Sequence, residues 1–367
     1  MKTKHYTLDK ILSKKAIYNI IIGERSNGKT FACLEYGIRK YFENKEQFAY
    51  IRRWREDLRG KRGANLFEGF TNNLERGNII KKLSRGRFNS VFYQSSRWYF
   101  ELIDEKTGEV KEREETPFCY GFALSESEHE KGMSYNGIKT IILDEMISRQ
   151  IYLDDEFIAF ANLISTIKRK RNDVIIFMLG NTISKWCPYF TEMGLTHVKT
   201  MKKDTIDVYT YGSSYLTVAV EFTENSAKTS KDEDYYFAFN NPKLKMITTG
   251  DWEQDSYPHC PFSYKSKDIM FTYFIKFDDD LLQCEIVMTD NVDFTFIHRK
   301  TTEIKNPDSD LIYQQECDPR PNYARKITTP VNPLQKKIAS YFIKEKVFYQ
   351  NNEIGEIVRN YLIWCKE

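Results

Sequence analysis

The chain lacks any run of about 18 apolar residues, the length that a membrane-spanning helix requires. Its first fifteen residues are mostly polar and charged, without the apolar segment of a secretory signal. The seven cysteines are scattered, with no Cys-x-x-Cys pair and no histidine at metal-binding spacing. These absences argue against a membrane protein, a disulfide scaffold and a zinc module. We therefore expect a cytosolic protein with reduced thiols.

The composition is that of a folded protein with more than one domain. At 367 residues the chain exceeds the size at which one hydrophobic core keeps growing, and 41% of it is hydrophobic. The net charge is only +3, but cations are concentrated in residues 51–62 and 76–87. Two interpretations fit such basic segments, a surface for a phosphate backbone and a solvated helix face.

The first half of the chain alternates strand-like and helix-like segments, which predicts an α/β sheet with crossover connections. Four runs are continuously apolar, as in strands that are buried on both faces: 16–22, 48–53, 140–145 and 174–181. Residues 29–42 and 154–170 are predicted to be helices between them. Residues 88–117 have the pattern of antiparallel hairpins, with a turn at "EKTG", and would form an insertion or an edge of the sheet.

The character of the sequence changes after about residue 200. A stretch rich in Ser, Lys and Asp, residues 223–234, predicts a linker or an exposed loop. A second pattern follows, with a hairpin over 271–290, a further strand and two terminal helices. We therefore expect three parts, namely 1–200, a connecting part over 201–259, and a small α+β domain over 260–367.

The segment "GERSNGKT" is a complete G-x-x-x-x-G-K-T motif between a predicted strand and a predicted helix. In such a loop the backbone N–H groups surround phosphates, the lysine offsets their charge, and the last hydroxyl ligates Mg²⁺. Lys29 and Thr30 take these last two roles. The sequence thus predicts an ATP and Mg²⁺ site whose nucleotide-binding residues include Gly23, Ser26, Asn27, Gly28, Lys29 and Thr30.

Two later strand ends carry polar residues that suit the same site. Asp144 and Glu145 follow the apolar run "TIIL", so Asp144 could hold the metal through water and Glu145 could polarise the attacking water. An acidic pair at a strand end can also be a helix cap, but beside a P-loop we favour the catalytic interpretation. Asn181, at the end of the next strand, is either a γ-phosphate sensor or a turn residue. No N-K-x-D guanine signature is present, which favours ATP.

The segments "GERSNGKT", "FAYIRRW", "GMSYNGIKTIILDE" and "FMLGNTISKWCPYF" together resemble the genome-packaging ATPases of small tailed phages. These are the phi29-like encapsidation proteins, which are related to large terminase subunits. The resemblance covers roughly residues 15 to 200, and the rest of the chain matches mainly in its order of elements. It implies an additional-strand P-loop ATPase domain, with a mostly parallel sheet and helices on both faces.

The resemblance also implies an activity and partners. Subunits would form a homo-oligomer, a pentameric ring at the portal of the empty capsid, and ATP hydrolysis would drive double-stranded DNA inward. A structural packaging RNA is a further expected partner. The protein would work in the host cytoplasm, transiently at the portal vertex of the procapsid, and not at a membrane.

Residue roles follow from the resemblance position by position. Lys29 and Thr30 correspond to the Walker A residues, Asp144 to the Walker B aspartate and Glu145 to the catalytic glutamate. Arg25, four residues before Lys29, corresponds to an arginine that reaches the phosphates within one subunit. Asn181 falls in the coupling motif of the family.

A run of four cations, Lys168 to Arg171, precedes the strand that ends at Asn181. In ring ATPases an arginine from one subunit completes the site of its neighbour. The resemblance places such an arginine here, with Arg169 the best match and Arg171 the next. DNA contact and a solvated helix end are the alternatives that we keep.

The C-terminal domain resembles a ribonuclease-H-like nuclease without its acids in the places that two-metal chemistry needs. The acidic run 278–280 predicts a hairpin turn, and Asp290 and Asp308 have no partner acid on a terminal helix. The resemblance implies a vestigial nuclease domain that binds nucleic acid, and we expect no nuclease activity. Two alternatives stay open: an active terminase large subunit with a metal-dependent nuclease, and a P-loop nucleic-acid-binding switch that is not a motor.

Overall fold

The computed structural model describes residues 6–365 except 131, 150, 213, 214, 224–251, 253, 254 and 291. The chain divides into two compact units, Met1–Trp252 and Glu253–Glu367. No helix in the described part of the chain combines the length and the apolar character that crossing a bilayer requires.

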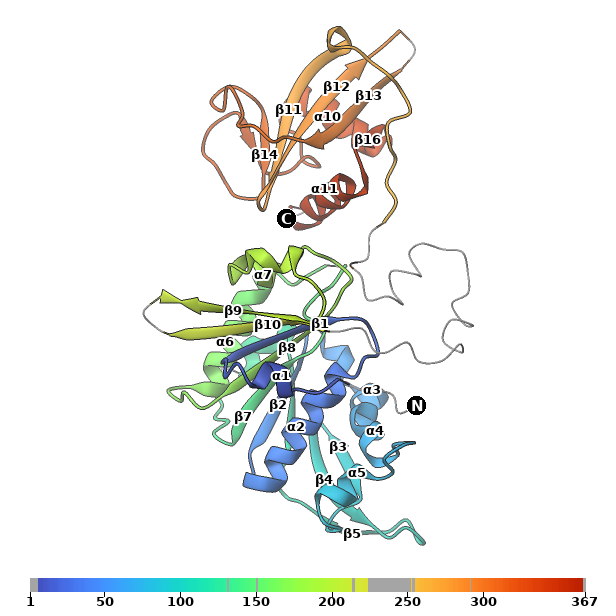
Figure 1. The fold of residues 1–367 in the computed structure, drawn as a ribbon, viewed down its shortest axis with the longest axis vertical. Coiled ribbons are helices and arrows are strands. Elements are labelled where there is room, and N and C mark those ends of the chain that lie inside the picture. Colours follow the sequence, from blue (N-terminus) through green and yellow to red (C-terminus); the bar gives the residue numbers. More distant parts are fainter. Residues whose placement is uncertain are drawn as a thin grey trace. The chain divides into compact units, whose positions relative to one another are not determined.

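A ten-stranded, mostly parallel sheet forms the centre of the first unit (Figure 1). Its strands are β1 (Tyr18–Gly23), β2 (Gln47–Arg52), β3 (Ser90–Gln94), β4 (Arg97–Ile103), β5 (Val110–Arg113), β6 (Cys119–Ala123), β7 (Ile138–Leu143), β8 (Ile175–Asn181), β9 (Thr205–Tyr211) and β10 (Leu216–Phe222). Their order is β3-β4-β6-β2-β7-β8-β1-β10-β9, and β5 pairs with β4. The central series β6-β2-β7-β8-β1-β10 is parallel throughout, whereas β3, β4, β5 and β9 pair antiparallel. The predicted central strands and edge hairpins are confirmed.

Helices cover both faces of this sheet (Figure 1). They are α1 (Asp9–Leu12), α2 (Lys29–Asn44), α3 (Gly60–Ala64), α4 (Glu68–Thr71), α5 (Ile79–Leu83), α6 (Glu156–Lys168) and α7 (Pro188–Glu192). Because strand side chains alternate between faces, Ile20 and Ile22 join the core under α6 and α7, while Ile21 joins the core under α2. Short 3-10 turns lie at Arg55–Leu58, Asn65–Phe67, Leu124–Glu130 and Thr196–Thr200.

The first unit extends beyond the boundary that the sequence suggested at residue 200. Strands β9 and β10 lie in the stretch that we assigned to a connecting part, yet β10 pairs in parallel with β1. The reason is that β10 is apolar enough to be buried, while β9 is an edge strand with a polar, half-exposed pattern. The linker predicted over 223–234 lies outside the described residues from residue 224 onward.

The second unit is a six-stranded sheet with two helices, as the sequence predicted for a small α+β domain. Its elements are β11 (Ile269–Phe277), β12 (Asp280–Met288), β13 (Asp293–Arg299), β14 (Ile312–Gln314), β15 (Tyr323–Ala324), β16 (Val347–Tyr349), α10 (Pro333–Ile343) and α11 (Asn352–Trp364), with a 3-10 turn at Ser266–Asp268. The strand order is β15-β14-β11-β12-β13-β16. Asp278 and Asp279 form the turn between β11 and β12, which confirms the predicted hairpin.

Candidate active site

The G-x-x-x-x-G-K-T loop connects the end of β1 to the start of α2. Its two glycines are required by different features. A side chain on Gly23 would place its Cβ 1.9 Å from the Thr223 hydroxyl, and Gly28 has a φ of 92°, which disfavours other residues. Ser26 also has a positive φ, of 60°. The conformation of the loop therefore depends on the residue types at these three positions.

The side chain of Lys29 lies inside the loop rather than in solvent, with 5% of the residue exposed. Its Nζ donates to the carbonyl oxygens of Gly23 at 3.3 Å and Glu24 at 2.6 Å. It also donates to the amide oxygens of Asn27 at 3.1 Å and Asn181 at 3.2 Å. The predicted sensor Asn181 is thus brought to the P-loop, because β8 lies next to β1 with Asn181 level with Gly23.

Burial lowers the pKa of Lys29 to about 8, against the opposing effect of the nearby carboxylates of Asp144 and Glu24. The four oxygen atoms around Nζ belong to uncharged groups, so they satisfy its N–H donors without a full counter-charge. A phosphate entering the loop would supply the missing negative charge.

Asp144 follows β7 and accepts three kinds of donor. The hydroxyl of Thr30 approaches its carboxylate at 3.2 Å, the hydroxyl of Tyr50 at 2.8 Å and the backbone N–H of Glu145 at 3.0 Å. Asp144 is 8% exposed, so these contacts fix its orientation. A hydroxyl and a carboxylate side by side are the oxygen ligands that Mg²⁺ takes alongside phosphates and water. The residues present therefore fit the predicted metal.

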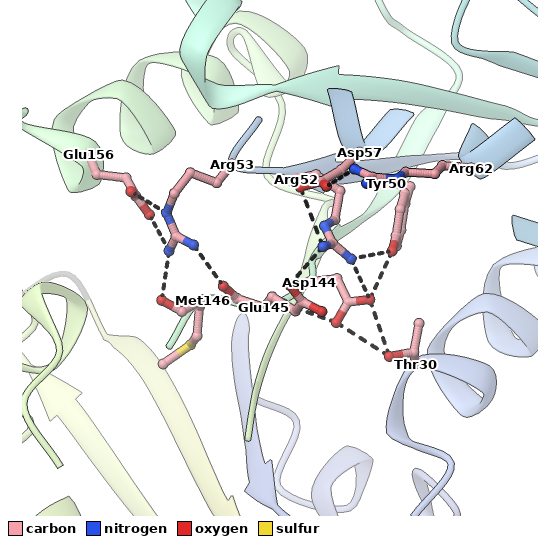
Figure 2. A network of polar contacts seen from close by, with 10 residues as sticks. All are labelled: Thr30, Tyr50, Arg52, Arg53, Asp57, Arg62, Asp144, Glu145, Met146 and Glu156. Atoms are coloured by element: carbon pink, nitrogen blue, oxygen red, sulfur yellow. Dashed lines mark hydrogen bonds and ion pairs between the residues drawn. The ribbon is translucent and has the colours of Figure 1, made fainter. Parts of the chain in front are cut away.

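Glu145 has an exposed side chain on a backbone with φ of 60°, which is uncommon for a residue other than glycine. Its carboxylate accepts from Arg52 at 2.7 Å, and the same guanidinium contacts Asp57 at 3.4 Å (Figure 2). On the main-chain side of Glu145, Arg53 and Glu156 form a buried ion pair. Figure 2 shows Arg52 on the side of Asp144 and Arg53 on the side of Met146.

These parts surround one cavity of about 310 Å³. The P-loop, Asp144, Glu145 and Asn181 line it, so the structure brings together most of the predicted site residues. Arg25 is exposed and is not among the residues that line the cavity. Tyr50, Arg52 and Arg53 lie in the segment "FAYIRRW" that carries part of the resemblance, but neither they nor Glu156 were predicted as site residues.

The two arginines proposed to act in trans lie at the opposite end of β8. This strand has seven residues, which span about 20 Å at ~3.3 Å per residue. Helix α6 ends at Lys168, before the arginines, and Arg169 has a positive φ of 47°. Neither arginine lines the cavity.

Arg169 and Arg171 differ in how they are held. The exposed Arg169 donates to the carbonyl oxygens of Gly132 and Met133 at the surface. Arg171 is partly buried and donates to the carbonyl oxygens of three residues, at distances of 2.9 to 3.3 Å: Tyr135, Ile138 and Ile167.

Comparison with known proteins gives one family and related solved structures. A family model described as Podovirus DNA encapsidation protein (Gp16) matches residues 1–102 and 117–364. The DNA packaging proteins of Bacillus phages phi29 and PZA are each 30% identical over 192 residues, which is 52% of this chain and 50% of theirs. The chain thus spans about half the length of the curated relatives it matches.

Two solved structures have the same fold over nearly the whole chain. The bacteriophage Phi-29 viral genome packaging motor assembly gives a TM-score of 0.55 at 20% identity, covering 98% of this chain and 99% of that one. The Phi-28 gp11 DNA packaging motor gives a TM-score of 0.54 at 20% identity, covering 100% of this chain and 99% of that one.

Proposed function

The chain belongs to the podovirus DNA encapsidation protein family, as its motifs indicated, and from this premise we propose that it hydrolyses ATP to move double-stranded DNA into a preformed capsid. One observation carries the proposal: the P-loop, the Asp144–Glu145 pair and Asn181 line a single cavity. A lysine, a metal-binding hydroxyl and carboxylate, and a second carboxylate that can activate water are the groups that phosphoryl transfer requires.

In the proposed reaction the loop N–H groups and Lys29 bind the phosphates of ATP, and Arg25 approaches them from the loop. Thr30 and Asp144 would hold Mg²⁺, Asp144 through water; when bound, the ion would offset the charge of the phosphates. Glu145 orients the attacking water and accepts its proton. Arg52 donates to one of the two carboxylate oxygens of Glu145, Oε2, at 2.7 Å, and so orients this carboxylate.

Asn181 would report the state of the site, because it contacts Nζ of Lys29 at 3.2 Å. When Lys29 turns to a phosphate, this contact changes, and β8 carries the change away from the nucleotide. This is the coupling role that we propose for Asn181.

We assign the trans-acting role to Arg169 in preference to Arg171. Nη2 of Arg171 donates to three partly buried backbone carbonyls, so moving this side chain would break these contacts. Arg169 is exposed and would lose only surface contacts. Because β8 separates both from the site of their own subunit, Arg169 acts only in an oligomer, which we propose to be a pentameric ring.

The second unit is proposed to be a vestigial ribonuclease-H-like domain that binds nucleic acid and has no nuclease activity. Its topology supports this, with an antiparallel β11-β12-β13 followed by β14 parallel to β11. Asp278 and Asp279 lie in a turn, and Asp280 pairs with Arg299. Within the described residues there is no group of three or more His, Cys, Asp or Glu placed to hold a metal.

The proposed partners are double-stranded DNA, the portal of the procapsid and a structural RNA. The proposed place of action is the host cytoplasm, transiently at the portal vertex. Nicking of supercoiled plasmid in the presence of Mn²⁺ would contradict the absence of nuclease activity.

The experiment that tests the ATPase assignment replaces Glu145 by Gln. We expect ATP turnover to be lost while nucleotide binding is kept, because the loop is unchanged. Substantial turnover in Glu145→Gln would remove Glu145 as the activating base.

The trans assignment is tested by mixing Arg169→Ala subunits with Glu145→Gln subunits under conditions of assembly. Only an interface that joins an intact Arg169 to an intact Glu145 can then react, so we expect activity to return. Turnover by Arg169→Ala monomers at the wild-type rate would instead favour the switch that is not a motor.

A further inference from the structure

We propose that Arg53 and Glu156 are positioning residues for the ATPase reaction, because their buried ion pair fixes the main chain that carries Glu145. This inference rests on the proposed function. Neither residue lines the cavity, so neither touches the reacting groups.

Both members of the ion pair are buried, and two hydrogen bonds join them. Arg53 is 8% exposed and Glu156 is 3% exposed. Nε of Arg53 donates to Oε2 of Glu156 at 2.6 Å, and Nη2 donates to Oε1 at 2.9 Å. This two-point geometry fixes the plane of the guanidinium.

The guanidinium then reaches the carbonyl oxygens of two successive peptide groups, those of Glu145 and Met146. Nη1 donates to the carbonyl oxygen of Glu145 at 3.3 Å, and Nη2 donates to that of Met146 at 3.1 Å (Figure 2). The N–H of Met146 is in turn bonded to the carbonyl oxygen of Leu179 on β8, at 2.9 Å. The main chain after Glu145 is therefore held from two directions.

Glu156 is itself anchored. Its carboxylate also accepts from the Tyr189 hydroxyl at 2.9 Å and from the N–H of Leu153 at 2.9 Å. Tyr152 packs against the Arg53 guanidinium at 4.8 Å from the ring centre. Burial alone would lower the pKa of Arg53, but the hydrogen bonds and charge of Glu156 hold it above its ordinary value. The pair is thus a fixed, charged support.

Such a support is needed because of the conformation of Glu145. A positive φ of 60° on a residue with a side chain costs on the order of 1 kcal/mol and persists only where surrounding contacts enforce it. A buried ion pair is a poor device for stability alone, since apolar residues of equal volume often serve as well. The hydrogen bonds from Arg53 to the Glu145 and Met146 carbonyls indicate that this ion pair positions the main chain at Glu145.

The test compares two identical substitutions at two equally buried glutamates. Glu156→Gln removes the charge behind Glu145. Glu101→Gln is the matched control, because Glu101 is 5% exposed and accepts from Arg113 at 2.9 and 3.1 Å, but lies on β4 and does not line the cavity. Single-turnover ATP hydrolysis, affinity for a non-hydrolysable ATP analogue and thermal unfolding are measured on the full chain.

We expect Glu156→Gln to slow hydrolysis by about 10- to 100-fold, as for other groups that orient reacting residues, with analogue affinity within about twofold. Glu101→Gln should hydrolyse ATP within about twofold of the wild type, whatever its loss of stability. Arg53→Lys keeps the charge but not the branched contacts, so it should also be slow. It serves as the second variant if Glu156→Gln does not fold.

The inference is overturned if Glu156→Gln or Arg53→Lys hydrolyses ATP at the wild-type rate, or if Glu101→Gln is slowed equally. It is also overturned if analogue affinity falls in parallel with the rate, since the loop would then be the part affected. The wild type and Glu145→Gln separate the two levels. Absence of ATP turnover in the assembled wild type refutes the proposed function, and turnover in Glu145→Gln removes Glu145 as the activating base. Inactivity of Glu145→Gln beside an unaffected Glu156→Gln refutes only the positioning role.

Discussion

The charge of Lys29 should make ATP binding depend on pH in a range where ATP itself changes little. Burial is the main cause that lowers the pKa of Lys29 to about 8. Raising the pH from 7 to 9 then reduces its charged fraction from about nine tenths to about one tenth. Because the terminal phosphate of ATP is already ionised above about pH 7, the change falls mainly on the lysine.

Only the charged amine offsets the phosphate charge, so the affinity for ATP should fall about tenfold between pH 7 and pH 9. Binding should also restore the proton, because the phosphates favour the ammonium form. At pH 8 this uptake is about half a proton per ATP bound, and at pH 6.5 it is nearly zero. The affinity of the site for ATP therefore falls as the pH rises.

Calorimetric titration with ATP and saturating Mg²⁺, in pairs of buffers with different ionisation enthalpies, measures both quantities. Lys29→Arg is the control, since a guanidinium stays charged throughout this range and should remove the proton uptake. A wild-type affinity that is constant from pH 7 to pH 9 would refute the reasoning. So would equal proton uptake by Lys29→Arg.

Three further outcomes are expected. Arg171→Ala should lower the free energy of unfolding in urea by about 2 kcal/mol, because the two hydrogens of Nη2, shared among three carbonyls, are worth about 1 kcal/mol each. The exposed Arg169→Ala should change it by less than about 0.5 kcal/mol. Equal losses would contradict the distinction between the two. Tyr50→Phe removes the donor to Asp144 at 2.8 Å and should slow ATP turnover at limiting Mg²⁺ by about tenfold, with rescue at high Mg²⁺ as the informative measurement. The hydrogen bond that the His298 ring donates to the Glu285 carboxylate is the first cause that raises the pKa of His298. Their pairing therefore stabilises the second unit fully below about pH 6.5 and is lost as the pH rises through the raised pKa. An unchanged His298 titration by NMR in Glu285→Gln would exclude this pair.

The sequence was sufficient for the parts of the site that are contiguous or that end a strand. The P-loop is one uninterrupted motif. Asp144 and Asn181 follow apolar runs, and the carboxyl ends of parallel strands meet at one edge of the sheet. Their approach to Thr30 and Lys29 could therefore be predicted without knowing the strand order.

Other features depended on contacts that no local pattern encodes. The pairing of β10 with β1 joins residues about 200 positions apart, and so the first unit was expected to end too early. In the same way, Glu156 meets Arg53 across 103 residues, and an isolated buried glutamate near a helix start resembles an ordinary capping residue.

The adjacent arginines of "FAYIRRW" show how strand geometry directs neighbouring cations of one basic segment to different contacts. Consecutive side chains of an extended chain point to opposite faces, so Arg52 and Arg53 leave the end of β2 in opposite directions. Because β2 pairs with β7, both meet the residue that follows Asp144. Arg52 takes the carboxylate of Glu145, and Arg53 takes its carbonyl oxygen. Residues 51–62 are therefore not one surface for phosphates. The first two cations contact Glu145, the proposed catalytic glutamate, and two of the later ones pair with acids, Arg55 with Glu126 and Arg62 with Asp57.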